Sequence, residues 1–176
     1  MVKIYCLSMV SSILDNIEFR KLDVYFHCPF DHDWSRASYL NIGTLENTND
    51  LWTYAHATKS NTHKGMFFIC RDGIFPSWDT DENLNGGCVS LKCLMDEVHD
   101  FFIDMLVKFA SNSIIIKNEW VDDNTKINNV KVNLISVSPK KNFCIIKIWL
   151  NCIDVEESNL QLPNGYTGKC VIRKHR

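Results

Sequence analysis

The most constraining feature of this sequence is the stretch from Cys70 to Gly87, CRDGIFPSWDTDENLNGG, which lies between apolar runs at 65–70 and 88–95. Its many turn-forming residues predict a strand, a long loop and a second strand. Trp78, followed directly by Asp79, lies in the middle of this loop. An indole there either folds back onto the sheet or is exposed to receive a flat ligand. The neighbouring carboxylate would suit a flat ring with positive charge and N–H donors.

The size and composition of the chain describe an ordinary globular protein. The 176 residues are enough for one domain with a full core, and 45% hydrophobic and 23% charged residues indicate neither disorder nor a fibre. The formal net charge of -2 argues against a protein that coats long nucleic acids, but it permits recognition of one nucleotide end. We expect an N-terminal extension at residues 1–20 and a single domain at residues 21–176.

The cysteines and the apolar runs bear on the cellular compartment. Eight cysteines lie at irregular spacings without a Cys-x-x-Cys pair, so we expect buried free thiols in a reducing compartment and no metal. The apolar run at the N-terminus is short and is soon followed by Asp15 and Glu18, which argues against a signal peptide. No run approaches the roughly 18 apolar residues of a membrane span. We therefore expect a cytoplasmic protein without a cofactor.

Hydrophobic patterns predict an α+β fold, in which strands alternate apolar and polar residues and helices repeat them every three to four residues. The clearest helix has a core-facing stripe from Leu94 to Phe109. A shorter helix follows Thr48 or Asn49, either of which could cap it. Segments 131–138 and 143–151 predict an antiparallel hairpin joined by the sequence PKKN. Further strands are expected at 21–28, 39–47, 65–73, 88–94 and 169–176.

The central loop resembles a motif of the translation initiation factor 4E family, [KR]-D-G-I-x-P-x-W-[ED], a polar segment and Gly-Gly. Residues 71–74, Pro76, Trp78–Asp79 and Gly86–Gly87 match it in register without a gap. The resemblance covers residues 21–155 well. It implies a curved antiparallel sheet with helices on its convex face, and a cleft on the concave face that binds the 7-methylguanosine cap of mRNA. The richness in cysteine, asparagine and isoleucine suggests a divergent member, of viral or protist type.

The resemblance assigns the residues that would bind the cap. A 7-methylated guanine is a delocalised cation, and two indoles can sandwich it for about 1–2 kcal/mol per face. Trp34 would be the first stacking partner, Trp78 the second, and Asp79 would accept N–H bonds from the base edge. The family usually has glutamate here, so the shorter aspartate requires a closer loop. Trp149 matches the tryptophan that contacts the methyl group, although a tryptophan within a strand is equally consistent with the core.

The phosphate ligands are where the chain departs from the family. Ser138 occupies the position of the family's arginine, and the hairpin turn is longer. Lys140 matches the first family lysine and Lys141 is its neighbour, so both are expected to bind the phosphates, although lysines on a turn are often simply solvated. The C-terminal segment 173–176 is a second candidate. Phe143 is placed to contact the first transcribed nucleotide.

A second surface is implied by the segment Asp50-Leu51-Trp52, which matches the D-[FL]-W motif of the family. In the family this tryptophan docks a YxxxxLΦ helix of the scaffold factor or of its competitors, and Ile103 and Val107 stand where the long helix contributes apolar contacts. The alternative is that Trp52 is a core residue of its helix. We expect Trp52, Ile103 and Val107 to bind a scaffold initiation factor or a repressor.

We therefore expect a monomeric cap-binding protein, not an enzyme, that recruits mRNA to translation initiation through a scaffold partner. The alternative is a repressor that binds caps without recruiting ribosomes. A decapping hydrolase would need a metal-binding carboxylate cluster, and the acidic stretches of this sequence do not have that pattern.

Overall fold

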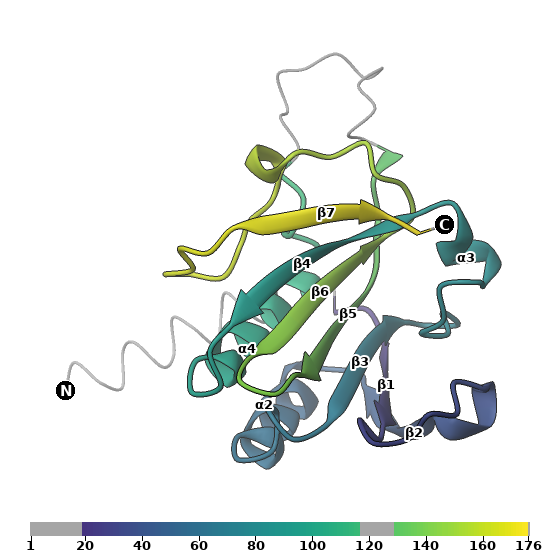
Figure 1. The fold of residues 1–176 in the computed structure, drawn as a ribbon, viewed down its shortest axis with the longest axis vertical. Helices are drawn as coiled ribbons and strands as arrows, with labels where there is room; N and C mark the ends of the chain where they lie inside the picture. The colour runs from purple at the N-terminus through teal and green to yellow at the C-terminus, as the bar shows by residue number, and fades with distance from the viewer. Residues whose placement is uncertain (1–18, 117–128, 176) are drawn as a thin grey trace.

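The structure, a computed structural model, describes residues 19–116 and 129–175. In this part of the chain seven strands form one antiparallel sheet in the order β2-β1-β3-β5-β6-β4-β7, and helices α2 and α4 lie on one of its faces (Figure 1). This confirms the predicted α+β fold. The strands are β1 (Leu22–His27), β2 (Leu40–Leu45), β3 (Met66–Arg71), β4 (Gly87–Cys93), β5 (Val132–Pro139), β6 (Cys144–Leu150) and β7 (Cys170–Lys174).

The core lies between the sheet and its two long helices, α2 (Thr48–Thr58) and α4 (Val98–Ala110). Because side chains alternate along a strand, each strand sends every second residue to this core. On β6, Ile146 and Ile148 are fully buried there, and Phe102 of α4 is fully buried with them. Lys147 and Trp149 belong to the opposite face, which no helix covers in Figure 1.

Two details of the helices differ from the sequence-based expectation. Asn47 caps α2, rather than Thr48 or Asn49, because its side chain accepts a hydrogen bond from the backbone N–H of Asp50 at 3.1 Å. Leu94 is not part of the core-facing stripe: it is 55% exposed, since the chain leaves β4 through a turn and α4 begins only at Val98.

The loop after β3 spans two strands of the sheet, because β5 and β6 lie between β3 and β4. It contains one short helix, α3 (Asp81–Leu84), which the sequence did not predict. Gly73 has φ +78°, a conformation that favours glycine. Gly86 is required for a different reason: a Cβ there would lie 1.9 Å from the carbonyl oxygen of Leu150. The glycines of the motif thus fix both the start and the end of the loop.

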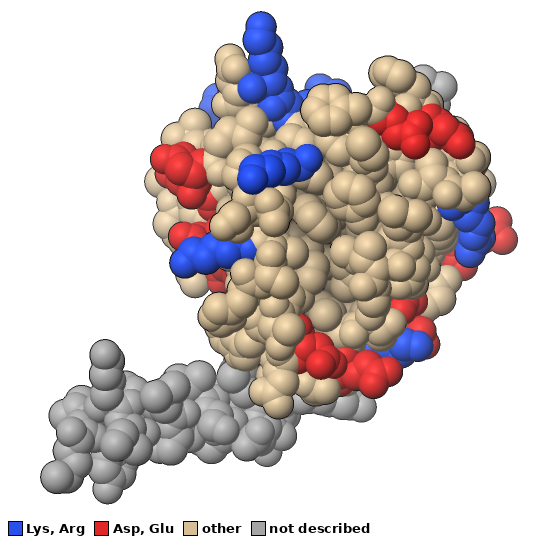
Figure 2. Space-filling view, turned by 90° about the horizontal axis from the view of Figure 1, so that it is seen from below, with Lys and Arg blue, Asp and Glu red and all other residues tan. Residues whose placement is uncertain are grey.

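The seven cysteines in the described part of the chain are free, and Cys70, Cys88, Cys93 and Cys144 are buried as expected, whereas Cys28 is exposed. The predicted N-terminal extension lies outside the described residues except for its last two. No helix of the described part is both long and apolar enough to cross a bilayer. Viewed from below (Figure 2), the middle of the surface is uncharged and both signs of charge lie at its margin, so this face carries no broad basic surface.

Candidate functional site

The uncovered face of the sheet contains a cavity of about 930 Å³. The five neighbouring strands β3, β5, β6, β4 and β7 form its floor, and the loops after β1 and β3 form one of its ends. Five of the six predicted cap-binding residues line it, and the sixth, Lys141, is exposed on the hairpin turn outside the lining. The five are Trp34, Trp78, Asp79, Lys140 and Trp149.

Trp34 is held in place by a ring that sequence reasoning missed. Its indole is 54% exposed and stacks on the buried imidazole of His27 with the ring centroids 4.2 Å apart and the planes 3° apart. His27 Nε2 donates to the backbone carbonyl of Asp33 at 2.8 Å. The Asp33 carboxylate in turn accepts from the backbone N–H and the hydroxyl of Ser35. One face of the indole is therefore covered by His27, and the ring is oriented before any ligand binds.

Trp78 lies on a loop that is held in place by the buried side-chain amide of Asn83. Asn83 is fully buried, and its side-chain N–H groups donate to the carbonyls of Phe75 (3.2 Å) and Ser77 (2.8 Å). Its amide oxygen accepts from Asn133 of β5 at 3.0 Å, which ties the loop to the sheet. Trp78 itself remains 48% exposed. This arrangement keeps the indole at the cavity instead of in the core.

Asp79 follows Trp78 in the chain and lines the same cavity. The Ser77 hydroxyl donates to Oδ1 of Asp79, and no described residue donates to Oδ2. Burial, and next the charge of Asp79, raise the pKa of Tyr39 to about 12. The carboxylate is thus close enough to Tyr39 to act on its titration, and one of its oxygens is available to accept from a ligand.

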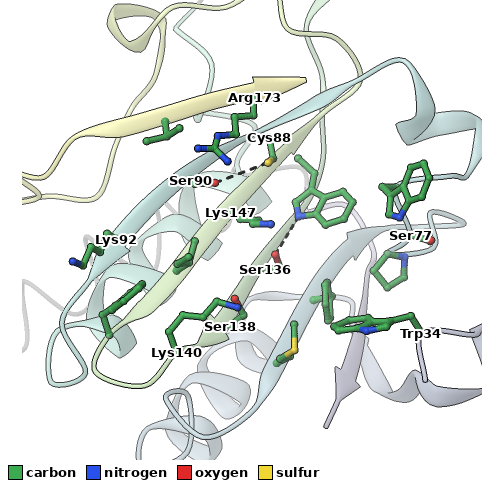
Figure 3. A pocket seen from close by; sticks show the side chains of 18 of the residues that line it. Trp34, Ser77, Cys88, Ser90, Lys92, Ser136, Ser138, Lys140, Lys147 and Arg173 are labelled. Carbon is green, nitrogen blue, oxygen red and sulfur yellow. Dashed lines mark hydrogen bonds between the residues drawn. The ribbon is translucent and has the colours of Figure 1, made fainter. Parts of the chain in front are cut away.

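Trp149 is the innermost tryptophan of the cavity. It is only 8% exposed and packs with Phe68, Cys70 and Leu134 in a small apolar cluster on this face. Its indole N–H donates to the hydroxyl of Ser136 at 3.1 Å, as the dashed line in Figure 3 marks. Trp149 is therefore part of a small core and of the cavity lining at once, which combines the two interpretations that the sequence left open.

Cationic side chains line the cavity from its middle, where Lys147 lies, to the end opposite Trp34 and Ser77, where Lys92 lies (Figure 3). Lys92 lies with its ammonium nitrogen 4.5 Å from the centroid of the Phe143 ring. Burial, and next the charge of Lys147, lower the pKa of His175. Sequence reasoning missed Lys92, Lys147 and Lys169 because no motif surrounds them, whereas Arg173 lies in the C-terminal segment 173–176 that the sequence offered as a second candidate. The cations are Lys92, Lys140, Lys147, Lys169 and Arg173.

A second, shallower cavity of about 680 Å³ lies between α2 and α4. It brings together the three residues that the sequence assigned to a partner surface. Trp52 is 44% exposed, so it is not a core residue of α2, and Ile103 and Val107 are half-buried. His56 and His99 also line this groove.

The cavity thus combines two half-exposed indoles, a carboxylate and five cations in one lining, and these groups suit a flat cationic ring that carries an anionic group. The sequence matches the model of the family Eukaryotic initiation factor 4E over residues 20–171, and the chain belongs to this family. The match continues past residue 155, where the resemblance was expected to weaken. These are initiation factors and not enzymes, which confirms the prediction of a non-enzymatic protein.

Solved structures of low sequence identity share the fold. A schistosome eIF4E complexed with m7GpppA and 4E-BP has a TM-score of 0.60 and 17% identity, with 79% of this chain and 73% of that chain covered. Caenorhabditis elegans eIF4E-3 with the 4E-binding protein Mextli and a cap analog has a TM-score of 0.64 and 10% identity, with coverage of 86% and 89%. Ascaris suum eIF4E-3 with an m7G cap has a TM-score of 0.58 and 10% identity, with coverage of 87% and 94%. The sequences of curated proteins gave no match.

Proposed function

We propose that this chain binds the 7-methylguanosine cap of mRNA in the cavity on the uncovered face of the sheet. In this proposal the methylated base stacks between Trp34 and Trp78, and its edge donates N–H bonds to Asp79. Trp149 contacts the methyl group, and Lys140 contributes to holding the phosphates. The protein acts as a monomer in the cytoplasm.

The observation that carries the proposal is that two half-exposed tryptophans from separate loops line one cavity beside a carboxylate. Exposed indoles are costly unless they serve binding, since each could bury a large apolar area. Here His27 and Asn83 hold the two loops in place without burying the indoles. Membership of the family and the cap-bound relatives of the same fold support the choice of ligand.

Retention on a 7-methylguanosine resin tests this proposal. The wild-type protein is expected to bind, whereas Trp34→Ala and Trp78→Ala are each expected to pass through with their melting temperatures nearly unchanged. Trp52→Ala is the matched control, because it removes an exposed tryptophan from the opposite side of the sheet. Wild-type protein that fails to bind, or tryptophan variants that bind normally, would contradict the proposal.

We further propose that the groove between α2 and α4 docks a helical segment of a scaffold initiation factor, through which capped mRNA is recruited to translation. An exposed tryptophan beside half-buried Ile103 and Val107 gives the apolar strip that such a helix needs. Titration with a YxxxxLΦ peptide is expected to show binding by wild type and loss in Trp52→Ala, with cap binding retained. Normal peptide binding by this variant would remove the docking proposal.

The competing function is a repressor that binds caps without recruiting ribosomes. Addition of the protein to a translation extract depleted of its own cap-binding factor distinguishes the two. A recruiting factor restores translation of a capped reporter, and Trp52→Ala does not. A repressor leaves the depleted extract inactive and inhibits the undepleted extract.

A further inference from the structure

Strand register determines where two of the cations lie on the cavity floor. Lys147 of β6 lies opposite Ser90 of β4 and opposite Ser136 of β5. Both neighbours are small, so the lysine stem rises from the floor without a large side chain on either side. Figure 3 shows Lys147 in the middle of the cavity floor, between Ser90 and Ser136.

Arg173 belongs to the same row of the sheet as Trp149. It pairs with Cys88 of β4, and Cys88 pairs with Trp149 of β6. Two strand spacings of about 4.8 Å put its Cα about 10 Å from that of Trp149, within reach of a group attached to a base at the tryptophans. The resemblance places the family's arginine at Ser138 of β5, and this serine is buried. The cavity therefore does contain a guanidinium, but it comes from β7.

These cations have no carboxylate partners within the described residues. The two ion pairs there, Lys21–Asp72 and Lys108–Asp104, lie elsewhere. Among the residues that the structure describes, Asp79 supplies the only carboxylate of the cavity lining, at the tryptophan end. Five like charges in one cavity lining, with no ion-pair partner among the described residues, favour an anionic ligand, because such a ligand removes their mutual repulsion.

We propose that the phosphate-binding site of this chain extends from Lys140 of the β5–β6 turn onto the sheet floor, where Lys147 and Arg173 hold the phosphate bridge of the cap. Lys92 and Lys169, farther from the tryptophans, bind the first phosphodiester groups of the RNA, so the RNA leaves the cavity across β4 and over edge strand β7. This inference rests on the proposed cap binding. It assigns Lys141, which lies outside the lining, no contact with the ligand.

The test measures tryptophan fluorescence during titration with three probes: 7-methylguanosine, its 5′-triphosphate and a capped pentanucleotide. Lys147→Met and Arg173→Gln are each expected to weaken triphosphate binding by about tenfold or more, the effect of removing a charged hydrogen bond. Binding of the nucleoside is expected to stay unchanged. The double variant Lys92→Gln/Lys169→Gln is expected to weaken only the pentanucleotide, with a salt-dependence slope lower by about 0.7 for each phosphate that the protein no longer neutralises.

Two exposed neighbours supply matched controls. Lys174 follows Arg173 on β7 but does not line the cavity, and Lys141 follows Lys140 in the same way. Lys174→Gln and Lys141→Gln remove the same charge and are expected to change every affinity by less than about twofold. Equal affinities for the triphosphate in Arg173→Gln, Lys147→Met and these controls would overturn the inference while leaving cap binding intact. A wild-type protein that binds none of the probes would instead refute the proposed function itself.

Discussion

The two faces of the sheet are built from the same strands, but one face packs against the helices and the other lines a cavity. On β6, Ile146 and Ile148 lie under α4 and are fully buried together with Phe102. Their neighbours Lys147 and Trp149 belong to the uncovered face, where they line a cavity. Alternation along a strand thus lets one segment supply a stabilising core on one side and the lining of a cavity on the other.

The difference shows where the free energy of folding comes from. The helical face has a continuous apolar core, whereas the uncovered face has only a small cluster around Trp149 and a floor of serines and lysines. Most of the apolar area buried on folding therefore lies on the helical side. The uncovered face can carry exposed indoles and a group of like-charged cations because the fold does not depend on them.

The largest expected effect is a difference in stability loss between a substitution on the helical face and one on the uncovered face. Phe102→Ala removes a fully buried ring and is expected to lower the free energy of unfolding by about 3–5 kcal/mol. Trp78→Ala is expected to lower it by less than about 1 kcal/mol, because this ring is half-exposed. Urea denaturation measures both. A loss of stability in Trp78→Ala as large as that in Phe102→Ala would show that the uncovered face is part of the core.

Asn83 is expected to contribute both to the stability of the fold and to cap binding. Asn83→Ala would leave the carbonyls of Phe75 and Ser77 without their donor, and it is expected to cost about 1–3 kcal/mol of stability. The loosened loop is expected to bind the cap less tightly as well. Asn85→Ala, an exposed asparagine in the same loop, is the control and should change neither quantity. Unchanged cap affinity in Asn83→Ala would show that the hydrogen bonds of Asn83 do not position Trp78.

The smallest expected effect concerns alkaline pH. The pKa of Tyr39 is raised to about 12, by burial and then by the charge of Asp79, so its neutral form is favoured in the folded protein. Its contribution to stability is complete below the ordinary tyrosine pKa of about 10, and it is lost as the pH rises toward about 12. Because the ring is only half-buried, this contribution is below about 1 kcal/mol.

Tyr39→Phe removes this titration. Urea unfolding at about pH 9 and about pH 11 is expected to show a smaller loss of stability in the variant than in the wild type over this interval. An identical loss in both proteins would mean that Tyr39 has an ordinary pKa and that Asp79 does not act on it.

Local sequence patterns were sufficient for much of the fold, and the resemblance to the 4E family supplied the candidate site residues, five of which line the cavity. The alternation in 143–151 predicted β6, and the spacing of Gly73, Pro76 and Trp78 identified the loop. Such signals are contained within a few neighbouring residues, and each has a local physical cause in turn geometry or in the period of a strand.

The rest depended on contacts between distant segments. His27 stacks on Trp34 through the return of the loop after β1, and nothing in the surrounding sequence indicates it. Lys147 and Arg173 meet at the cavity only because β4 lies between β6 and β7, an order that local patterns do not determine. Lys141 was expected beside Lys140 in the site, yet adjacent residues of a turn need not face the same way.

The central claim is that the uncovered face binds a positively charged, methylated base between two indoles. Fluorescence titration of the wild-type protein with 7-methylguanosine triphosphate and with unmethylated GTP tests it most directly. Cation–π attraction of about 1–2 kcal/mol on each of two faces predicts strong quenching and an affinity at least about 30-fold higher for the methylated nucleotide. Equal affinities for the two nucleotides, or an absence of quenching by either, would contradict the account.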